Sequence, residues 1–256
     1  MTTTSATPRA PPNNLIGLGL LATFLALGWA LAALPPGKTP LTFAFVLVGW
    51  VLAVMAHEFS HAAVAFLAGD HTVRDKGYLA FDPRRYADLG VSLVIPLVFL
   101  ALGGIGFPGG AVYLRNDLMR SKLWRTAASL AGPAATYGVL LLLAVVLITL
   151  GREGLPNGLF DAIAMLAFLQ ATALLLNLLP LPGLDGFNAL RPYLPEAWET
   201  GLRKIEGLVF VGVFIAFSFI PGFSRFLFGG GAIIAHLAGV PLEAAQGGWD
   251  AFRFWT

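Results

Sequence analysis

The chain has 256 residues, of which 57% are hydrophobic and 12% charged. Soluble domains carry about a quarter charged residues, so the composition predicts an all-α polytopic membrane protein. The absence of cysteine excludes disulfides and thiolate zinc sites. The net charge of +2 does not indicate a nucleic-acid partner, because the basic residues are scattered over short loops beside apolar spans, where they determine topology.

The N-terminal residues 1–14 are polar and proline-rich, which predicts a disordered tail. The apolar segment 15–34 follows directly. It is long enough for a full span and longer than the core of a signal peptide, which has about 7–15 residues. We therefore expect an uncleaved first transmembrane helix.

About six transmembrane helices are expected in all. Further apolar segments lie at 41–67, 91–107, 127–150, 160–180 and 205–220, with a weaker one at 225–240 that either spans or lies at the interface. The segment 91–107 is short, contains Pro96 and ends in a run of glycines, which predicts a re-entrant or hairpin segment near 91–110. Residues 15–240 then form a single transmembrane domain, and the aromatic-rich residues 241–256 an interfacial tail.

The distribution of positive charge predicts the orientation of the spans. If 91–107 re-enters, then the N-terminal tail, 68–126 and 181–204 all lie on one side of the membrane. That side carries most of the lysines and arginines and is therefore the cytoplasm of a cell-membrane protein. The spans 41–67 and 160–180 both run toward it.

The run His57-Glu58-Phe59-Ser60-His61 lies within the apolar segment 41–67. On a helix, His57 and His61 face the same way and can bind one metal ion. Glu58 is not needed as a ligand, so it is free to act as a general base. An ionisable side chain costs about 2.5–3.5 kcal/mol at the membrane centre, so such a cluster needs metal binding or hydration to offset it. The pattern is the H-E-x-x-H arrangement of zinc hydrolases.

Asp185 is the best candidate for a third ligand, since catalytic zinc usually takes three protein ligands. It follows the inward-running span 160–180, so its carboxylate can reach the depth of the two histidines. The alternative is that Asp185 is only a turn residue in its Gly-Leu-Asp-Gly sequence.

Three motifs together resemble the site-2 protease family of intramembrane zinc metalloproteases. They are His57-Glu58-Phe59-Ser60-His61, Asn177-x-x-Pro180 and Leu184-Asp185-Gly186. The resemblance covers roughly residues 41–195, and the absence of an inserted soluble domain is typical of compact prokaryotic members. It implies regulated intramembrane proteolysis, in which the partners are a transmembrane protein substrate and membrane lipid.

The resemblance also implies the roles of individual residues. His57, His61 and Asp185 would hold one Zn2+ per chain, and Glu58 would be the general base. Asn177 would help to hold the substrate strand or the oxyanion. The oligomeric state is not indicated.

Two glycine-containing motifs extend the resemblance. Gly103, Gly104, Ile105 and Gly106 are similar to the family's membrane-associated hairpin, which could pair with an unwound substrate strand; the alternative is an irregular connector. Ala131-Gly132-Pro133 is similar to a small-residue motif that opens one of the family's spans.

The chain departs from the family at two places. Phe187-Asn188 follow Asp185-Gly186 where Gly-Arg is common, and Thr136 stands where asparagine is frequent. These differences bear on substrate preference and on the groups around the ligands.

Two other functions fit parts of the pattern. A transporter or ion relay could use the buried cluster of His57, Glu58, His61 and Asp185, although no internal repeat of the kind common in transporters is evident. A proteolytically silent homologue that binds membrane helices without cutting them is the other alternative.

Overall fold

The computed structural model describes residues 14–35, 39–85, 113–195, 198, 201–202 and 206–255. Within these ranges the regular elements are all helices, and four of them are long and apolar enough to cross a membrane. These four are α1 (Leu15–Ala33), α2 (Pro40–Ala68), α5 (Lys122–Gly154) and α6 (Asn157–Asn177). The prediction of an all-helical multi-pass membrane protein is confirmed.

The remaining elements are shorter. They are α3 (Thr72–Asp75), α7 (Asp185–Leu190), α9 (Glu206–Phe219), α10 (Pro221–Leu237) and α11 (Leu242–Phe252), with 3-10 turns η1 (Pro83–Arg85), η3 (Asn116–Leu118) and η4 (Arg191–Tyr193).

The predicted count of about six spans is not confirmed. Across the described ranges there are four candidate spans, or five if α9 and α10 together make one span. These two helices meet at 93°, where Pro221 interrupts the apolar run. The predicted hairpin near 91–110, including Gly103, Gly104, Ile105 and Gly106, lies outside the described residues.

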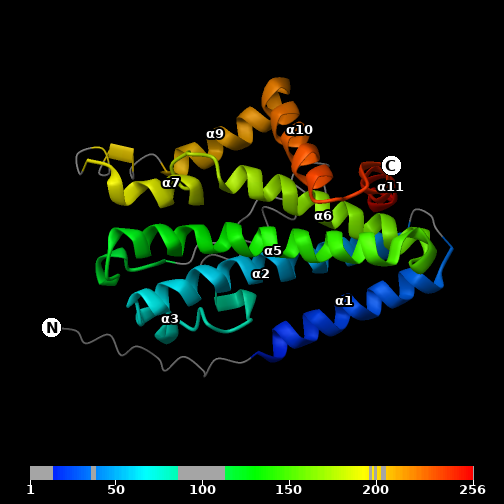
Figure 1. Cartoon of the computed structure of the whole chain (residues 1–256), viewed down its shortest axis with the longest axis horizontal. Helices are drawn as coiled ribbons and strands as arrows, with labels where there is room; N and C mark the ends of the chain where they lie inside the picture. The colour runs from blue at the N-terminus through cyan, green and yellow to red at the C-terminus, as the bar shows by residue number, and fades with distance from the viewer. Residues whose placement is uncertain are drawn as a thin grey trace.

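The long helices form a bundle in which α6 is central. In Figure 1, α2, α5 and α6 run side by side, α1 flanks α2, and α9 and α10 form an inverted V above α6. Most of the apolar stretch of α6 is buried, whereas that of α1 is mostly exposed. The exposed leucines of α1 and α5 therefore face the lipid, and the core lies around α6.

The C-terminal end of α2 meets the N-terminal end of α5. Arg120 donates its backbone N–H to the carbonyl of Ala68 at 3.0 Å, and its guanidinium donates to the carbonyl of Leu67. The buried carboxylate of Asp70 accepts the backbone N–H of Arg115 at 2.7 Å. The described residues that follow α2 and those that precede α5 therefore lie side by side.

Residues 241–256 contain a packed helix that the sequence did not predict. Ala244, Ala245, Gly248 and Phe252 of α11 are buried, and α11 lies against α6. A Cβ on Gly248 would lie 2.7 Å from the Cβ of Met165, which shows how closely the two helices approach. An interfacial location for the end of this tail stays a prediction.

Close packing of α10 on α6 depends on Gly231. A Cβ there would lie 3.2 Å from the Cα of the buried Thr172, closer than such contacts normally allow. We expect Gly231→Ala to lower the free energy of unfolding by about 1–3 kcal/mol, because the backbone of α6 must shift.

Gly229 in the same helix supplies the control, since a Cβ there meets nothing within 4 Å. Gly229→Ala should hold or raise the free energy of unfolding by up to about 1 kcal/mol, because alanine favours helix. Thermal unfolding in detergent measures both variants, and equal melting temperatures would contradict the tight contact.

Candidate metal centre

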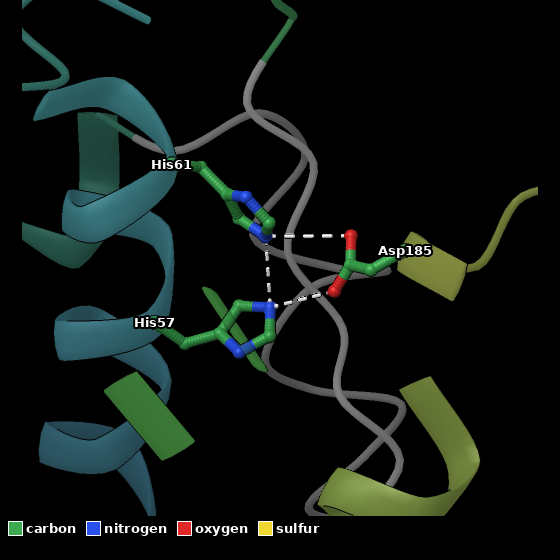
Figure 2. Close-up of side chains that lie close together, drawn as sticks. All are labelled: His57, His61 and Asp185. Carbon is green, nitrogen blue, oxygen red and sulfur yellow. Dashed lines mark hydrogen bonds and ion pairs between the residues drawn. The ribbon is translucent and has the colours of Figure 1, made fainter. Parts of the chain in front are cut away.

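The helix α2 brings His57 and His61 to one point. Their side chains extend from successive turns, as Figure 2 shows, and their Nε2 atoms lie 3.0 Å apart. The two residues are 6% and 7% exposed. The convergence predicted from their spacing is therefore present in the structure.

Asp185 reaches the same point from α7. Its Oδ2 lies 3.1 Å from His57 Nε2, and its Oδ1 lies 3.3 Å from His61 Nε2. Figure 2 shows the carboxylate facing both rings from the opposite side. The structure thus places Asp185 at the depth that the sequence predicted for it.

Glycines make the tight turn that carries Asp185. Gly183 has a φ of +93°, a conformation that side chains disfavour. A Cβ on Gly186 would lie 2.5 Å from the carbonyl carbon of Leu178, so only glycine lets α7 start against the end of α6. At the other end of α7, the hydroxyl of Thr126 donates to the carbonyl of Ala189 at 2.8 Å. Asp185 is therefore the first residue of α7, and the turn before it directs its carboxylate at the histidines.

The three donor atoms fit a single metal ion. Atoms bound about 2.0–2.1 Å from a tetrahedral zinc lie about 3.3 Å from one another. The two Nε2 atoms are 3.0 Å apart, and the Asp185 carboxylate places Oδ2 3.1 Å from that of His57 and Oδ1 3.3 Å from that of His61. In addition, two Nε2 lone pairs at 3.0 Å repel unless a proton or a cation lies between them. Two imidazoles and one carboxylate also form a usual donor set for catalytic zinc.

The outer nitrogens of both rings are held by α5. His61 Nδ1 lies 2.7 Å from the carbonyl oxygen of Ala128, which can only accept, so Nδ1 carries the proton and Nε2 presents its lone pair. His57 Nδ1 lies 2.9 Å from Thr136 Oγ1. Histidines that bind metals usually donate their other N–H in this way. From the sequence alone, Thr136 stood out only as a departure from the asparagine common in the family. Its position one helical turn after Gly132 was the available sign that it lies near the site.

Gly132 lets α5 approach the ligand nitrogens. A Cβ on Gly132 would lie 2.5 Å from His57 Nε2 and 2.6 Å from His61 Cε1, and nearer still to His61 Nε2. Gly132 of the small-residue motif at 131–133 thus lies beside the Nε2 atoms at which a metal would bind. Any larger side chain would fill that space.

The carboxylate of Asp185 is ionised. Burial by itself raises the pKa of this carboxyl, but the neighbouring imidazoles of His61 and His57 hold the pKa well below its ordinary value. An ionised carboxylate is the form that binds metal.

Glu58 and Asn177 are the two other predicted site residues that the structure describes. Glu58 is 3% exposed and follows His57 on α2. Asn177 is the last residue of α6 and is 4% exposed. Its Nδ2 has no hydrogen-bond partner within the described part of the chain. A buried amide of this kind costs about 1–3 kcal/mol, so it is available to a bound ligand.

Curated relatives cover almost the whole chain. It is 42% identical over 249 residues to the protein named "Putative zinc metalloprotease Rip2" of Mycobacterium tuberculosis, a match that covers 97% of this chain and 95% of the relative. The Rip2 protein of Mycolicibacterium smegmatis is 37% identical over 252 residues, with the same coverage. This chain belongs to the site-2 protease family of zinc metalloproteases. A more distant relative of this site-2 protease is YwhC of Bacillus subtilis, another zinc metalloprotease by name, which is 26% identical over 182 residues, covering 68% of this chain and 80% of YwhC.

No family model and no solved structure matches the chain. The relatives and the donor set together confirm the prediction of a site-2 protease-like zinc metalloendopeptidase with zinc as cofactor. They favour the protease over the transporter alternative.

Proposed function

We propose that this site-2 protease cleaves transmembrane segments of membrane proteins in or near the bilayer, as in regulated intramembrane proteolysis. One observation carries the proposal: the donor atoms of the buried His57 and His61 and of the half-buried Asp185 converge within a bundle of apolar helices. Ionisable groups within such a bundle mark a functional site. A substrate that reaches them laterally comes from the membrane.

Each of the described site residues takes a definite role. His57, His61 and Asp185 would hold the zinc, and the bound ion would supply the positive charge that lowers the pKa of a water and polarises a substrate carbonyl. Glu58 accepts the proton of the attacking water and delivers it to the leaving amine. The free amide N–H of Asn177 donates to the substrate backbone or to the developing oxyanion.

The substrate must unwind before it is cut. Peptide groups within a transmembrane helix are hydrogen-bonded to one another and shielded from attack. Glycine or proline in the substrate eases unwinding, and we assign Gly103, Gly104, Ile105 and Gly106 to pairing with the unwound strand. That assignment rests on the sequence.

The active site is proposed to face the cytoplasmic half of a cell membrane. The loops and helix ends beside the site are rich in positive charge, which favours the cytoplasmic side. The basic residues there are Arg74, Lys76, Arg84, Arg85, Arg115, Arg120 and Lys122. Arg152 follows at the opposite end of α5.

Zinc content and cleavage, measured on the same vesicle-reconstituted samples, test the proposal. Wild type should hold about one zinc per chain, as a catalytic site does, and should cut a generic transmembrane substrate. Asp185→Ala should lose both, because one of the three donors is gone. Asp117→Ala is the matched control, since this exposed carboxylate pairs only with Arg115 in the described structure and should keep both.

The outcomes separate the parts of the proposal. Wild type without zinc or cleavage, after zinc has been resupplied, would overturn the ligand assignment. Cleavage of an unfolded soluble protein but of no transmembrane substrate would overturn intramembrane proteolysis and leave the protease.

A further inference from the structure

We infer that Thr136 is a positioning residue for the metal: its hydroxyl holds the imidazole of His57 in the tautomer that presents Nε2 to zinc. This inference rests on the proposed function, because it requires His57 to be a ligand. The helix α5 would then contribute to the site twice: Gly132 leaves room for the ligand nitrogens, and Thr136 orients His57.

The contrast between the two histidines carries the inference. The proton of His61 is fixed on Nδ1 by the carbonyl of Ala128, a group that can only accept. Among the described residues no carbonyl holds His57 Nδ1, which instead lies 2.9 Å from Thr136 Oγ1, and both residues are buried. The partner that favours a proton on His57 Nδ1 is therefore one side chain, which a substitution can remove.

Asp185 gives His57 an alternative tautomer. Its Oδ2 lies 3.1 Å from His57 Nε2, so without metal it favours a proton on Nε2. Metal binding requires that proton to leave Nε2, and neutral imidazole then carries its proton on Nδ1. A hydroxyl both donates and accepts, so the Thr136 oxygen can then accept a hydrogen bond from Nδ1–H of His57. An apolar side chain would leave a buried N–H without a partner, which opposes metal binding.

Thr136→Val tests this directly, because valine keeps the shape of threonine and lacks the hydroxyl. We expect its zinc affinity, measured by competition with a chelator on the detergent-purified full chain, to fall by about 10–100-fold. Thr136→Ser retains the hydroxyl and should restore affinity to within about threefold of wild type.

Thr149→Val is the matched control. Thr149 lies on the same helix, is exposed, and donates its hydroxyl to its own helix at Val145 O, 2.7 Å away. This variant should bind zinc like wild type. Co2+ in place of zinc adds a spectroscopic readout: Thr136→Val should alter the visible absorption of the bound ion, and Thr149→Val should not.

The failures are distinguishable. If wild type and His57→Ala bind zinc equally, His57 is not a ligand and the proposed function fails with this inference. If His57→Ala loses zinc while Thr136→Val binds it as tightly as wild type, the positioning role of Thr136 alone is overturned. Loss of affinity in Thr136→Val that Thr136→Ser does not restore would also overturn it, since packing would then be the cause.

Discussion

Glu58→Gln is expected to keep zinc bound and to lower the rate of cleavage by about 10²–10⁴-fold, the usual contribution of a general base. Glutamine has nearly the shape of glutamate but cannot take a proton from water. Glu58 is not among the three converging donor atoms, so the metal should remain. Zinc content and single-turnover cleavage of a transmembrane substrate, measured on the same preparation, check both halves of the prediction.

Glu243→Gln provides the control for this experiment. Glu243 is exposed in the first turn of α11, and the same change there should alter neither zinc content nor rate. A Glu58→Gln protein that cleaves at the wild-type rate would assign the base to another residue. Wild type that binds membrane helices but never cuts them, with Glu58→Gln binding equally well, would identify a silent homologue.

Local periodicity explains why the core of the site was predictable. His57 and His61 are one turn apart on a single helix, so their convergence follows from helix geometry alone. Asp185 is distant in sequence, yet the lengths of the spans fix the depth at which each helix ends. The predicted depth of Asp185 in the membrane and its carboxylate were therefore sufficient to assign it to the same metal site as the two histidines.

Contacts that depend on the rotation of one helix against another were not predictable. Gly132 and Thr136 meet the histidines only because one face of α5 packs on α2. The helix α11 escaped prediction because small residues such as Ala244 and Gly248 bury it on α6 without forming a long apolar run. Such packing is decided by the shapes of both partners, which no single segment of sequence contains.

Gly132→Ala adds a single methyl group, and we expect this small change to disrupt the metal centre. The added methyl group would lie 2.5 Å from His57 Nε2 and nearer to His61 Nε2, the two nitrogens that would bind the metal. Relief requires the backbone of α5 to move away, and that movement would take with it the carbonyl of Ala128 that orients His61. We therefore expect both zinc and cleavage to be lost.

Gly138→Ala is the control that separates this effect from a general effect of alanine in α5. A Cβ on Gly138 meets nothing within 4 Å. Alanine stabilises a helix by about 1 kcal/mol relative to glycine, so Gly138→Ala should be at least as stable as wild type and fully active. The two variants are compared by zinc content, cleavage and thermal unfolding.

The outcomes have different meanings. Retention of zinc in Gly132→Ala would mean that α5 does not lie against the ligand nitrogens. Loss of zinc in both variants would point to an effect of alanine on the helix as a whole. Loss in Gly132→Ala alone would locate the effect at the Nε2 atoms of the two histidines.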